Sequence, residues 1–252
     1  MKQPTISIVV PVYNEVDNIE PLGNAIINAM ENVPYEYEVV FVDDGSRDGS
    51  AEKAKEWCAV HSAFRSIHFK KNAGQTAAMD AGFKHAKGRY VVSMDADLQN
   101  DPADIPKLLE KLKTYDMVCG WRQKRNDPWL KRISSKVANA IRNRLSQEEI
   151  KDTGCSLKAY RKECLDKIKL FNGMHRFLPT LFKMEGFTVA EVVVNHYPRK
   201  FGKSKYGISN RAFRAFIDLL VVRWMKERKL NYEVKNNGSS PYRVGKNERK
   251  KS

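Results

Sequence analysis

The sequence lacks any hydrophobic run long enough to cross a lipid bilayer, which takes about 20 consecutive apolar residues. The longest apolar stretch near the C-terminus, Ala215 to Met225, is too short and is interrupted by Asp218 and Arg223. The N-terminus also lacks the apolar region and small-residue cleavage site of a secretory signal. We therefore expect a cytoplasmic protein without a transmembrane helix.

Cysteine is scarce as well. The four cysteines of the 252 residues are Cys58, Cys119, Cys155 and Cys164, and they show neither Cys-x-x-Cys pairing nor the spacing of metal ligands. This excludes a disulfide scaffold and a zinc site of the usual spacing, so we expect reduced, structural thiols.

Acidic residues are in short supply in the second half of the chain. Residues 1–110 carry 11 Lys and Arg against 17 Asp and Glu, whereas residues 111–252 carry 34 against 13. The second half must meet something anionic, and nucleic acid, an anionic membrane surface and phosphorylated small molecules all fit this field. Part of the excess lies in residues 231–252, which we expect to form a disordered basic tail.

The first half alternates continuous apolar segments with amphipathic ones, which predicts a doubly wound, mostly parallel α/β sheet. We expect strands at Ile6–Val10, Val39–Val42, Ser66–Phe69, Tyr90–Met94 and Met117–Gly120. Helices are expected over Asp48–Val60, Gly74–Ala86 and Pro102–Lys113, the last of them opened by Asp101. Because ligands of such sheets bind beyond the carboxyl ends of the strands, the residues after each strand are the candidate site.

The most informative of these segments is Asp95-Ala96-Asp97-Leu98-Gln99, which directly follows the strand predicted at Tyr90–Met94. Two carboxylates and an amide oxygen at alternating positions offer hard oxygen ligands to one pocket. This donor set suits Mg²⁺ or Mn²⁺ carrying a diphosphate.

Two further loops follow the first two strands. In Pro11-Val12-Tyr13-Asn14-Glu15, the tyrosine offers a flat face to a base and the glutamate can accept from a ribose or base donor. In residues 43–50, the glycines allow a tight turn and the carboxylates can hold a base amide or a ribose hydroxyl. Taken singly, each loop is equally well explained as a turn that starts a helix.

Together these motifs resemble glycosyltransferase family 2 and its GT-A fold. The resemblance is carried by Val9-Val10-Pro11-Val12-Tyr13-Asn14-Glu15, Val42-Asp43-Asp44-Gly45-Ser46-Arg47-Asp48-Gly49, Asn72-Ala73-Gly74 and Asp95-Ala96-Asp97-Leu98-Gln99, in this order. Within the family, the chain looks most like the branch of dolichyl-phosphate mannose synthases and bacterial polyprenyl-phosphate glycosyltransferases. The resemblance covers about residues 5 to 225.

The resemblance implies one domain over residues 1–230, with a nucleotide half at about 1–121 and an acceptor half at about 122–230. The positions that would hold the nucleoside are Pro11, Tyr13, Glu15, Val42 and Asp44. The positions that would meet the sugar diphosphate and its Mg²⁺ or Mn²⁺ are Asp95, Ala96, Asp97 and Gln99. We expect Asp97 and Gln99 as direct metal ligands, and Asp95 as a third ligand or a nucleotide contact.

The acceptor side follows the last core strand, in residues 120–125 and a helix predicted over Pro128–Leu145. In the family this region resembles the segment that binds a lipid phosphate, with Arg122, Arg132 and Ser135 as the matching positions. Guanidinium groups bind phosphate oxygens in a bidentate manner. For the remaining cations of this helix, a solvated helix face is the simpler explanation.

Asp152 opens a segment, residues 152–161, in which the family usually reads Asp-x-x-Ser-Gly-Phe-Arg and this chain departs at 154–158. A sugar hydroxyl acceptor would need a general base, for which Asp152 is the first candidate. A phosphate monoester, with a second pKa near ~6, is already largely anionic at neutral pH and is its own nucleophile. The resemblance then implies attack on the anomeric carbon with inversion, with Asp95, Asp97 and Arg122 carrying the chemistry.

A basic loop at residues 195–207 follows a strand predicted over Thr188–Val194. It looks like the flexible loop of the family, in which Arg199 and Lys205 would reach the diphosphate and close the site. The alternative is a mobile basic surface loop. His196 is more simply explained as a packing residue at a strand end.

After this loop, apolar residues keep helical spacing and draw one stripe. The stripe consists of Phe213, Phe216, Ile217, Leu220, Val221 and Trp224. It fits either a helix that faces the core, which is the favoured interpretation, or a helix that lies in a membrane interface with cations at the headgroups. The second interpretation predicts peripheral attachment to the inner face of the membrane, with or without a separate membrane-anchoring protein.

We therefore expect a glycosyltransferase that moves a mannose- or glucose-type sugar from a GDP- or UDP-sugar to a polyprenyl phosphate. One alternative is a family 2 enzyme that acts on a sugar hydroxyl of a growing glycan. A basic nucleic-acid-binding module would explain the charge of the second half, but it leaves the acidic motif after Met94 without a role. We expect no nucleic acid partner.

Overall fold

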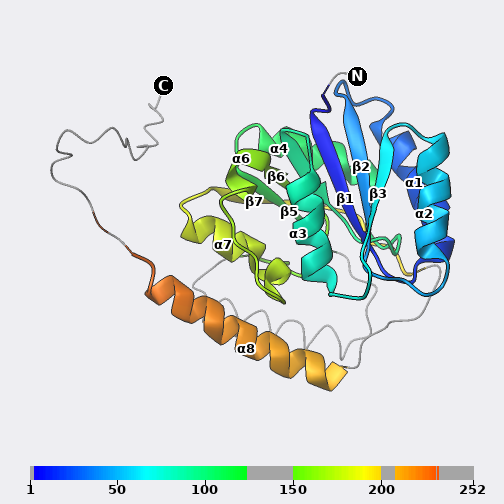
Figure 1. Cartoon of the computed structure of the whole chain (residues 1–252). Helices are drawn as coiled ribbons and strands as arrows, with labels where there is room; N and C mark the ends of the chain where they lie inside the picture. Colours follow the sequence, from blue (N-terminus) through cyan, green and yellow to red (C-terminus); the bar gives the residue numbers. More distant parts are fainter. Residues whose placement is uncertain (1–2, 124–149, 200–207, 231, 233–252) are drawn as a thin grey trace, which may run out of the picture.

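The computed structural model describes residues 3–123, 150–199, 208–230 and 232, and for residues 208–216 it describes the main chain only. Within these residues the core is a seven-stranded sheet with the order β3-β2-β1-β4-β6-β5-β7 (Figure 1). Six strands confirm the predicted ones to within two residues at each end. They are β1 (Ile6–Val12), β2 (Tyr37–Asp43), β3 (Phe64–His68), β4 (Tyr90–Ser93), β5 (Met117–Trp121) and β7 (Val189–Val193).

The seventh strand, β6 (Lys158–Arg161), was not expected from the sequence. It lies between β4 and β5 and runs antiparallel to both, so that Lys158 is in register with Ser93 on one side and Cys119 on the other. All the other pairs in the sheet are parallel. Because β6 is reversed, the loop that precedes it reaches the carboxyl edge of the parallel strands.

Helices cover both faces of the sheet, as a doubly wound fold requires. Along β1, Ile8 and Val10 pack into one apolar cluster with α1, α2 and α4, while Val9 packs into another with α3, α6 and α7. The helices are α1 (Val16–Met30), α2 (Ser50–Val60), α3 (Gln75–His85), α4 (Ile105–Leu112), α6 (Lys162–Leu165), α7 (Leu178–Met184) and α8 (Ile208–Glu227), with 3-10 turns η1 (Pro102–Asp104) and η2 (Met174–Phe177). The predicted helices after Asp48, Gly74 and Asp101 are confirmed, and the Asp101 carboxylate accepts from the Ala103 N–H as a helix cap.

Helix α8 runs below the carboxyl edge of the sheet in Figure 1. It packs through Leu219 and Val222 against Met174, Phe177 and Leu181. Four residues of the predicted apolar stripe instead face outward, since Ile217, Leu220, Val221 and Trp224 are 43%, 45%, 41% and 61% exposed. The core-facing interpretation is thus wrong for these four, and the side chains of the other two fall among residues described by main chain only. No helix in the described residues has the length and apolarity to span a bilayer.

Candidate active site at the carboxyl edge of the sheet

The acidic motif forms a tight loop beyond β4. Leu98 has a φ of 57°, which a leucine seldom adopts, and this reverses the chain immediately after Asp97. The main-chain N–H of Gln99 then donates to the Asp97 carboxylate at 3.1 Å. The loop therefore holds the carboxylate of Asp97 in a fixed orientation at the sheet edge.

Asp95 and Asp97 share one crowded environment. Asp95 accepts from the side-chain amide of Gln75, at the start of α3, at 2.7 Å. Loss of water and the neighbouring Asp97 charge raise the pKa of Asp95 to about 6. Loss of water also raises the pKa of Asp97, although the Gln99 N–H and the Arg199 charge oppose this. Two carboxylates held this close favour a shared cation.

In the structure, the cation that pairs with Asp97 is the guanidinium of Arg199, which joins Asp97 to Glu15. It donates to Asp97 at 2.8 Å and to Glu15 at 3.1 Å, with the Arg199 side chain 28% and both carboxylate side chains 10% exposed. Glu15 also accepts from the Asn18 side chain. The structure thus brings together three residues that the sequence assigned to one site, from loops after β1, β4 and β7.

Asp44 has a different environment from the one expected for a nucleoside contact. Its carboxylate accepts from the main-chain N–H groups of Ala73 and Gly74 at 2.6 and 2.9 Å, and from the Asn72 side chain at 2.8 Å. Loss of water nevertheless raises its pKa. Asp44 therefore holds the loop before α3, and this explains why Asn72-Ala73-Gly74 accompanies the aspartate in the sequence.

Arg122, directly after β5, is paired with Asp152 in a bidentate manner. The guanidinium donates to the two carboxylate oxygens at 2.8 and 3.0 Å, and the Arg122 main-chain N–H donates at 3.2 Å. Asp152 is only 2% exposed. Both residues were predicted at the site, but their pairing was not.

Three residues of the site were missed by sequence reasoning: Gln75, Asn100 and Ser156. The Ser156 hydroxyl accepts from the Asp95 N–H at 3.3 Å and from the Asn100 side chain at 2.7 Å. Ser156 could not be placed without the reversed strand β6, whose position no periodicity indicates. Gln75 carried a weak signal, since it follows a predicted helix start at the same sheet edge.

The remaining predicted residues fall into three groups. Pro11, within β1, and Tyr13, in the loop after it, are half-buried, whereas Val42 and Ala96 are buried, so contacts of these last two to a ligand would involve main-chain atoms. The positions that lie outside the described residues are Arg132, Ser135 and Lys205, together with the helix predicted over 128–145 and most of the tail at 231–252.

The donor set suits a small divalent cation whose coordination is completed by a ligand. In the part of the chain that the structure describes, no three His, Cys, Asp or Glu side chains gather as a complete metal site. Mg²⁺ is usually bound by one or two carboxylates, with water and substrate phosphates supplying the rest. Asp95 and Asp97 supply that number, while the side-chain amide of Gln99 donates to the Tyr197 carbonyl at 3.4 Å.

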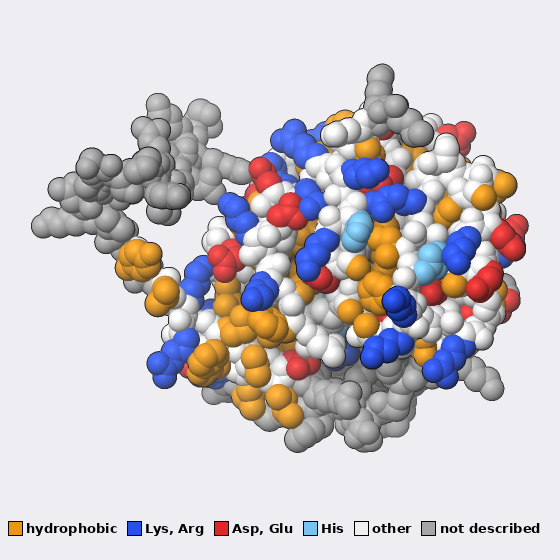
Figure 2. Space-filling model, in the orientation of Figure 1, with side chains coloured by type: hydrophobic (Ala, Val, Ile, Leu, Met, Phe, Trp, Pro, Cys, Tyr) orange, Lys and Arg blue, Asp and Glu red, His pale blue; other side chains and the backbone are white. Residues whose placement is uncertain are grey.

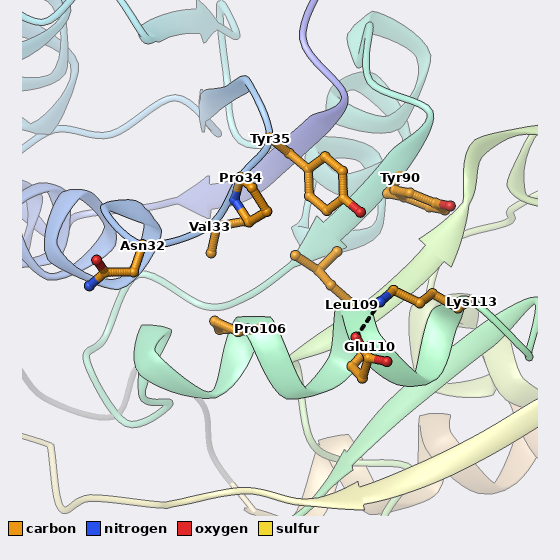
Figure 3. Close-up of a pocket in the computed structure, with 9 residues that line it drawn as sticks. All are labelled: Asn32, Val33, Pro34, Tyr35, Tyr90, Pro106, Leu109, Glu110 and Lys113. Carbon is orange, nitrogen blue, oxygen red and sulfur yellow. Dashed lines mark ion pairs between the residues drawn. The ribbon is translucent and has the colours of Figure 1, made fainter.

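A separate cavity of about 180 Å³ lies at the opposite edge of the sheet (Figure 3). Tyr35 and Tyr90 line it near the amino ends of β2 and β4, and Lys113 pairs with Glu110 at 2.6 Å across from them. None of the candidate site residues lines it.

The chain is similar to known proteins in sequence and in fold. Residues 7–169 match the family model described as Glycosyl transferase family 2. Over 223 residues the chain is 40% identical to dodecaprenyl-phosphate galacturonate synthase of Rhizobium johnstonii, covering 86% of this chain and 66% of that protein, slightly less than two thirds of its length.

Solved structures share the fold at lower identity. Glucosyl-3-phosphoglycerate synthase from Mycobacterium tuberculosis, in complex with Mn²⁺, UDP and phosphoglyceric acid, has a TM-score of 0.70 at 19% identity, over 87% of this chain and 78% of that one. The mannosyltransferase PcManGT from Pyrobaculum calidifontis, in complex with GDP-Man and Mn²⁺, has a TM-score of 0.59 at 21% identity, over 90% of this chain and 65% of that one.

Proposed function

Because the chain belongs to glycosyl transferase family 2 and has the GT-A fold, we propose that it transfers a sugar from a nucleotide sugar to a polyprenyl phosphate, with inversion at the anomeric carbon. The observation that carries the proposal is the cluster of Glu15, Asp97 and Arg199 beside Asp95. The proposal assigns Asp95 and Asp97 to a metal ion and the Arg199 guanidinium to the diphosphate.

On the donor side, Asp95 and Asp97 would hold Mg²⁺ or Mn²⁺, with Gln99 as a further ligand. A divalent ion there neutralises the charge that grows on the departing diphosphate. Arg199 would leave Glu15 and Asp97 and pair with phosphate oxygens, which frees Glu15 for the nucleoside. Pro11, Tyr13 and the buried Val42 and Asp44 would shape the nucleoside pocket, and Lys205 would add a second cation.

On the acceptor side, Arg122 would bind the lipid phosphate, with Arg132 and Ser135. The pairing of Arg122 with Asp152 favours a phosphate over a sugar hydroxyl as the acceptor. Asp152, the first candidate for a general base, is 2% exposed and spends both oxygens on Arg122. A carboxylate held in this way is poorly placed to take a proton from a hydroxyl, whereas a phosphate needs no base.

Helix α8 supports a lipid acceptor at a membrane surface. Its exposed face holds Ile217, Leu220, Val221 and Trp224, and Figure 2 shows apolar side chains gathered there with Lys and Arg beside them. Such a face suits the interface of an anionic bilayer. A separate membrane protein is a second way to hold the chain at the inner face of the membrane.

A chain of contacts connects α8 with the site. Asp218 of α8 packs so closely against Gly173 that a Cβ atom added to Gly173 would overlap the Asp218 carboxylate. The Gly173 N–H donates to the hydroxyl of Thr76 at 3.0 Å, and the next residue back along the chain, Gln75, donates to Asp95. The apolar face and the acidic cluster therefore belong to the same end of the molecule.

The decisive experiment is a screen of nucleotide sugars with Mg²⁺ or Mn²⁺ and a short polyprenyl phosphate, read by mass spectrometry. The panel includes GDP-mannose, UDP-glucose and UDP-galacturonate, the last because a relative carries galacturonate in its name. A glycosylated polyprenyl phosphate is expected from one donor. Product only with a free oligosaccharide acceptor would instead favour the hydroxyl alternative.

A further inference from the structure

One short segment, residues 152–158, contacts both sides of the candidate site. At its start, Asp152 holds the Arg122 guanidinium and the Arg122 N–H. Near its end, the Ser156 hydroxyl accepts from the Asp95 N–H and from the Asn100 side chain. The proposed donor and acceptor residues are therefore attached to the same piece of chain, at positions four residues apart.

Lys158 is the last residue of this segment and the first residue of β6. It is only 3% exposed, although lysine is almost never buried without a partner. Its ammonium donates to the carbonyl oxygen of Thr153 at 3.3 Å and to that of Cys155. Among the described residues it forms no salt bridge, so its hydrogen bonds are spent on the main chain of the segment itself.

Contacts with the neighbouring strands β4 and β5 also restrict the movement of this segment. The Ser93 hydroxyl donates to the Ser156 carbonyl at 2.9 Å, and the main-chain N–H of Gly120 donates to the Leu157 carbonyl at 2.9 Å. A Cβ on Gly154 would lie 3.3 Å from the Arg122 guanidinium. The segment is thus fixed at its end by the neighbouring strands and in its middle by Lys158.

We propose that Lys158 is a positioning residue that couples the two halves of the site, by fixing the turn between Asp152 and Ser156. The ammonium holds the carbonyls of Thr153 and Cys155 at a set distance from β6. Arg122 and the Asp95 loop consequently keep one relative position, which an in-line attack of acceptor on donor requires. The catalytic meaning of this coupling rests on the function proposed above, whereas the coupling itself does not.

The direct test is hydrogen exchange at two main-chain amides, those of Asp95 and Arg122. Both donate into the segment, to Ser156 and Asp152 respectively. In Lys158→Met both amides are expected to lose protection together, by about tenfold, because the turn between their acceptors relaxes. Lys162→Met is the matched control, since this lysine pairs with Asp166 four residues along the chain. Unchanged protection at either amide in a folded Lys158→Met variant overturns the proposal.

Kinetics give a second readout that a purely structural role would not move. We expect Ser156→Ala to raise KM chiefly for the donor, Asp152→Asn to raise KM chiefly for the acceptor, and Lys158→Met to raise both by about tenfold. A Lys158→Met enzyme with a lower melting temperature and both wild-type KM values contradicts the coupling. Absence of wild-type turnover with every donor would count against the proposed function, and the exchange result would still decide the coupling.

If Lys158→Met does not fold, the two single variants decide the question. Coupling predicts that Ser156→Ala also speeds exchange at the Arg122 amide, and that Asp152→Asn speeds it at Asp95, each by about threefold. If each substitution speeds exchange only at the amide that donates to the replaced side chain, the proposal is overturned.

Discussion

The guanidinium of Arg199 lies 2.8 Å from a carboxylate oxygen of Asp97, from which it is separated by 102 residues of chain. The same group reaches Glu15, so one arginine neutralises the residues proposed for both ends of the donor. Under the proposed function, a metal ion and this arginine would compete for Asp97 until a diphosphate binds both.

Replacing Arg199 with Gln should separate metal binding from turnover. Without the competing guanidinium, Mn²⁺ alone is expected to bind about threefold or more tightly, because Asp97 no longer loses an ion pair. Turnover should fall by about 10²-fold, because the diphosphate loses a cation. Calorimetric titration with Mn²⁺ and steady-state kinetics check the two effects. Lys53→Gln, which removes a surface cation paired with Glu20, is the control, and weaker Mn²⁺ binding by the Arg199 variant would contradict the competition.

Asp97→Ala should abolish turnover and leave the fold intact. The carboxylate is proposed as a metal ligand, so a loss of about 10³-fold or more is expected. Turnover and circular dichroism are measured side by side. Asp80→Ala serves as the control, because Asp80 lies on α3 and pairs with Lys84 at the surface. Retained activity of the Asp97 variant would remove it from the metal site.

Arg122→Ala should chiefly weaken use of the acceptor, and it should also destabilise the protein. The buried Asp152 carboxylate would lose its bidentate ion pair, which costs about 3–5 kcal/mol. The double variant Arg122→Ala/Asp152→Asn also removes the buried negative charge, so it should regain much of the stability and still use the acceptor poorly. Thermal unfolding and the acceptor KM distinguish the two effects. An unchanged acceptor KM in both variants would exclude Arg122 from the acceptor site.

The outward face of α8 should bind anionic vesicles. Leu220→Asp and Trp224→Ala are expected to lower the fraction that floats with such vesicles, because both side chains are exposed and apolar. Val60→Asp is the control, since Val60 is 76% exposed at the end of α2. A wild-type chain that stays entirely in solution speaks against membrane docking, and it leaves a separate membrane protein as the alternative.

Glu38 should make stability depend on acid pH. Burial acts to raise its pKa, but hydrogen bonds from Arg65, Ser7 and the Lys87 N–H hold the pKa below the ordinary value of 4.5. Because the folded pKa is below the unfolded one, ionised Glu38 stabilises the fold above the unfolded pKa. This contribution is lost as the pH falls through the folded pKa.

Glu38→Gln should therefore lower the free energy of unfolding at pH 7 by about 1–3 kcal/mol. It should also flatten the loss of stability between neutral pH and pH 3, measured by denaturant unfolding at several pH values. Glu36→Gln, at an exposed position two residues earlier, should change neither. An equal acid dependence in the wild type and Glu38→Gln would contradict the assignment.

The centre of the parallel sheet was predictable because β1, β2 and β4 contain continuous apolar runs. Val9 and Val40, for example, are buried within strands covered on both faces. The reversed strand was not predictable, because Lys158-Ala159-Tyr160-Arg161 is short and begins and ends on cations. These four residues form a strand because they pair with β4 on one side and β5 on the other, and that arrangement exists only in the assembled sheet.

The candidate site was predictable where carboxylates and arginines follow predicted strands, as with Asp97 and Arg122. The ion pairs between these residues were not predictable. Pairs such as Arg199 with Glu15 join loops that are distant in the sequence, and they depend on the conformation of long side chains. The direction in which α8 faces was also missed. Leu219 and Val222 pack against the core, and they lie next to the apolar stripe that the helical periodicity had indicated.

The reversed strand also constrains how the chain can be made or re-engineered. A nascent chain that has emerged only as far as Trp121 contains β4 and β5 but not β6, which pairs with both. One edge of β4 and one edge of β5 therefore stay unpaired until residues 158–161 have been synthesised. Open edges are sites of aggregation. Exchanging all residues after Trp121 for the corresponding part of another enzyme would remove β6. A chimaera designed to change acceptor preference therefore needs to keep Lys158–Arg161 together with β4 and β5.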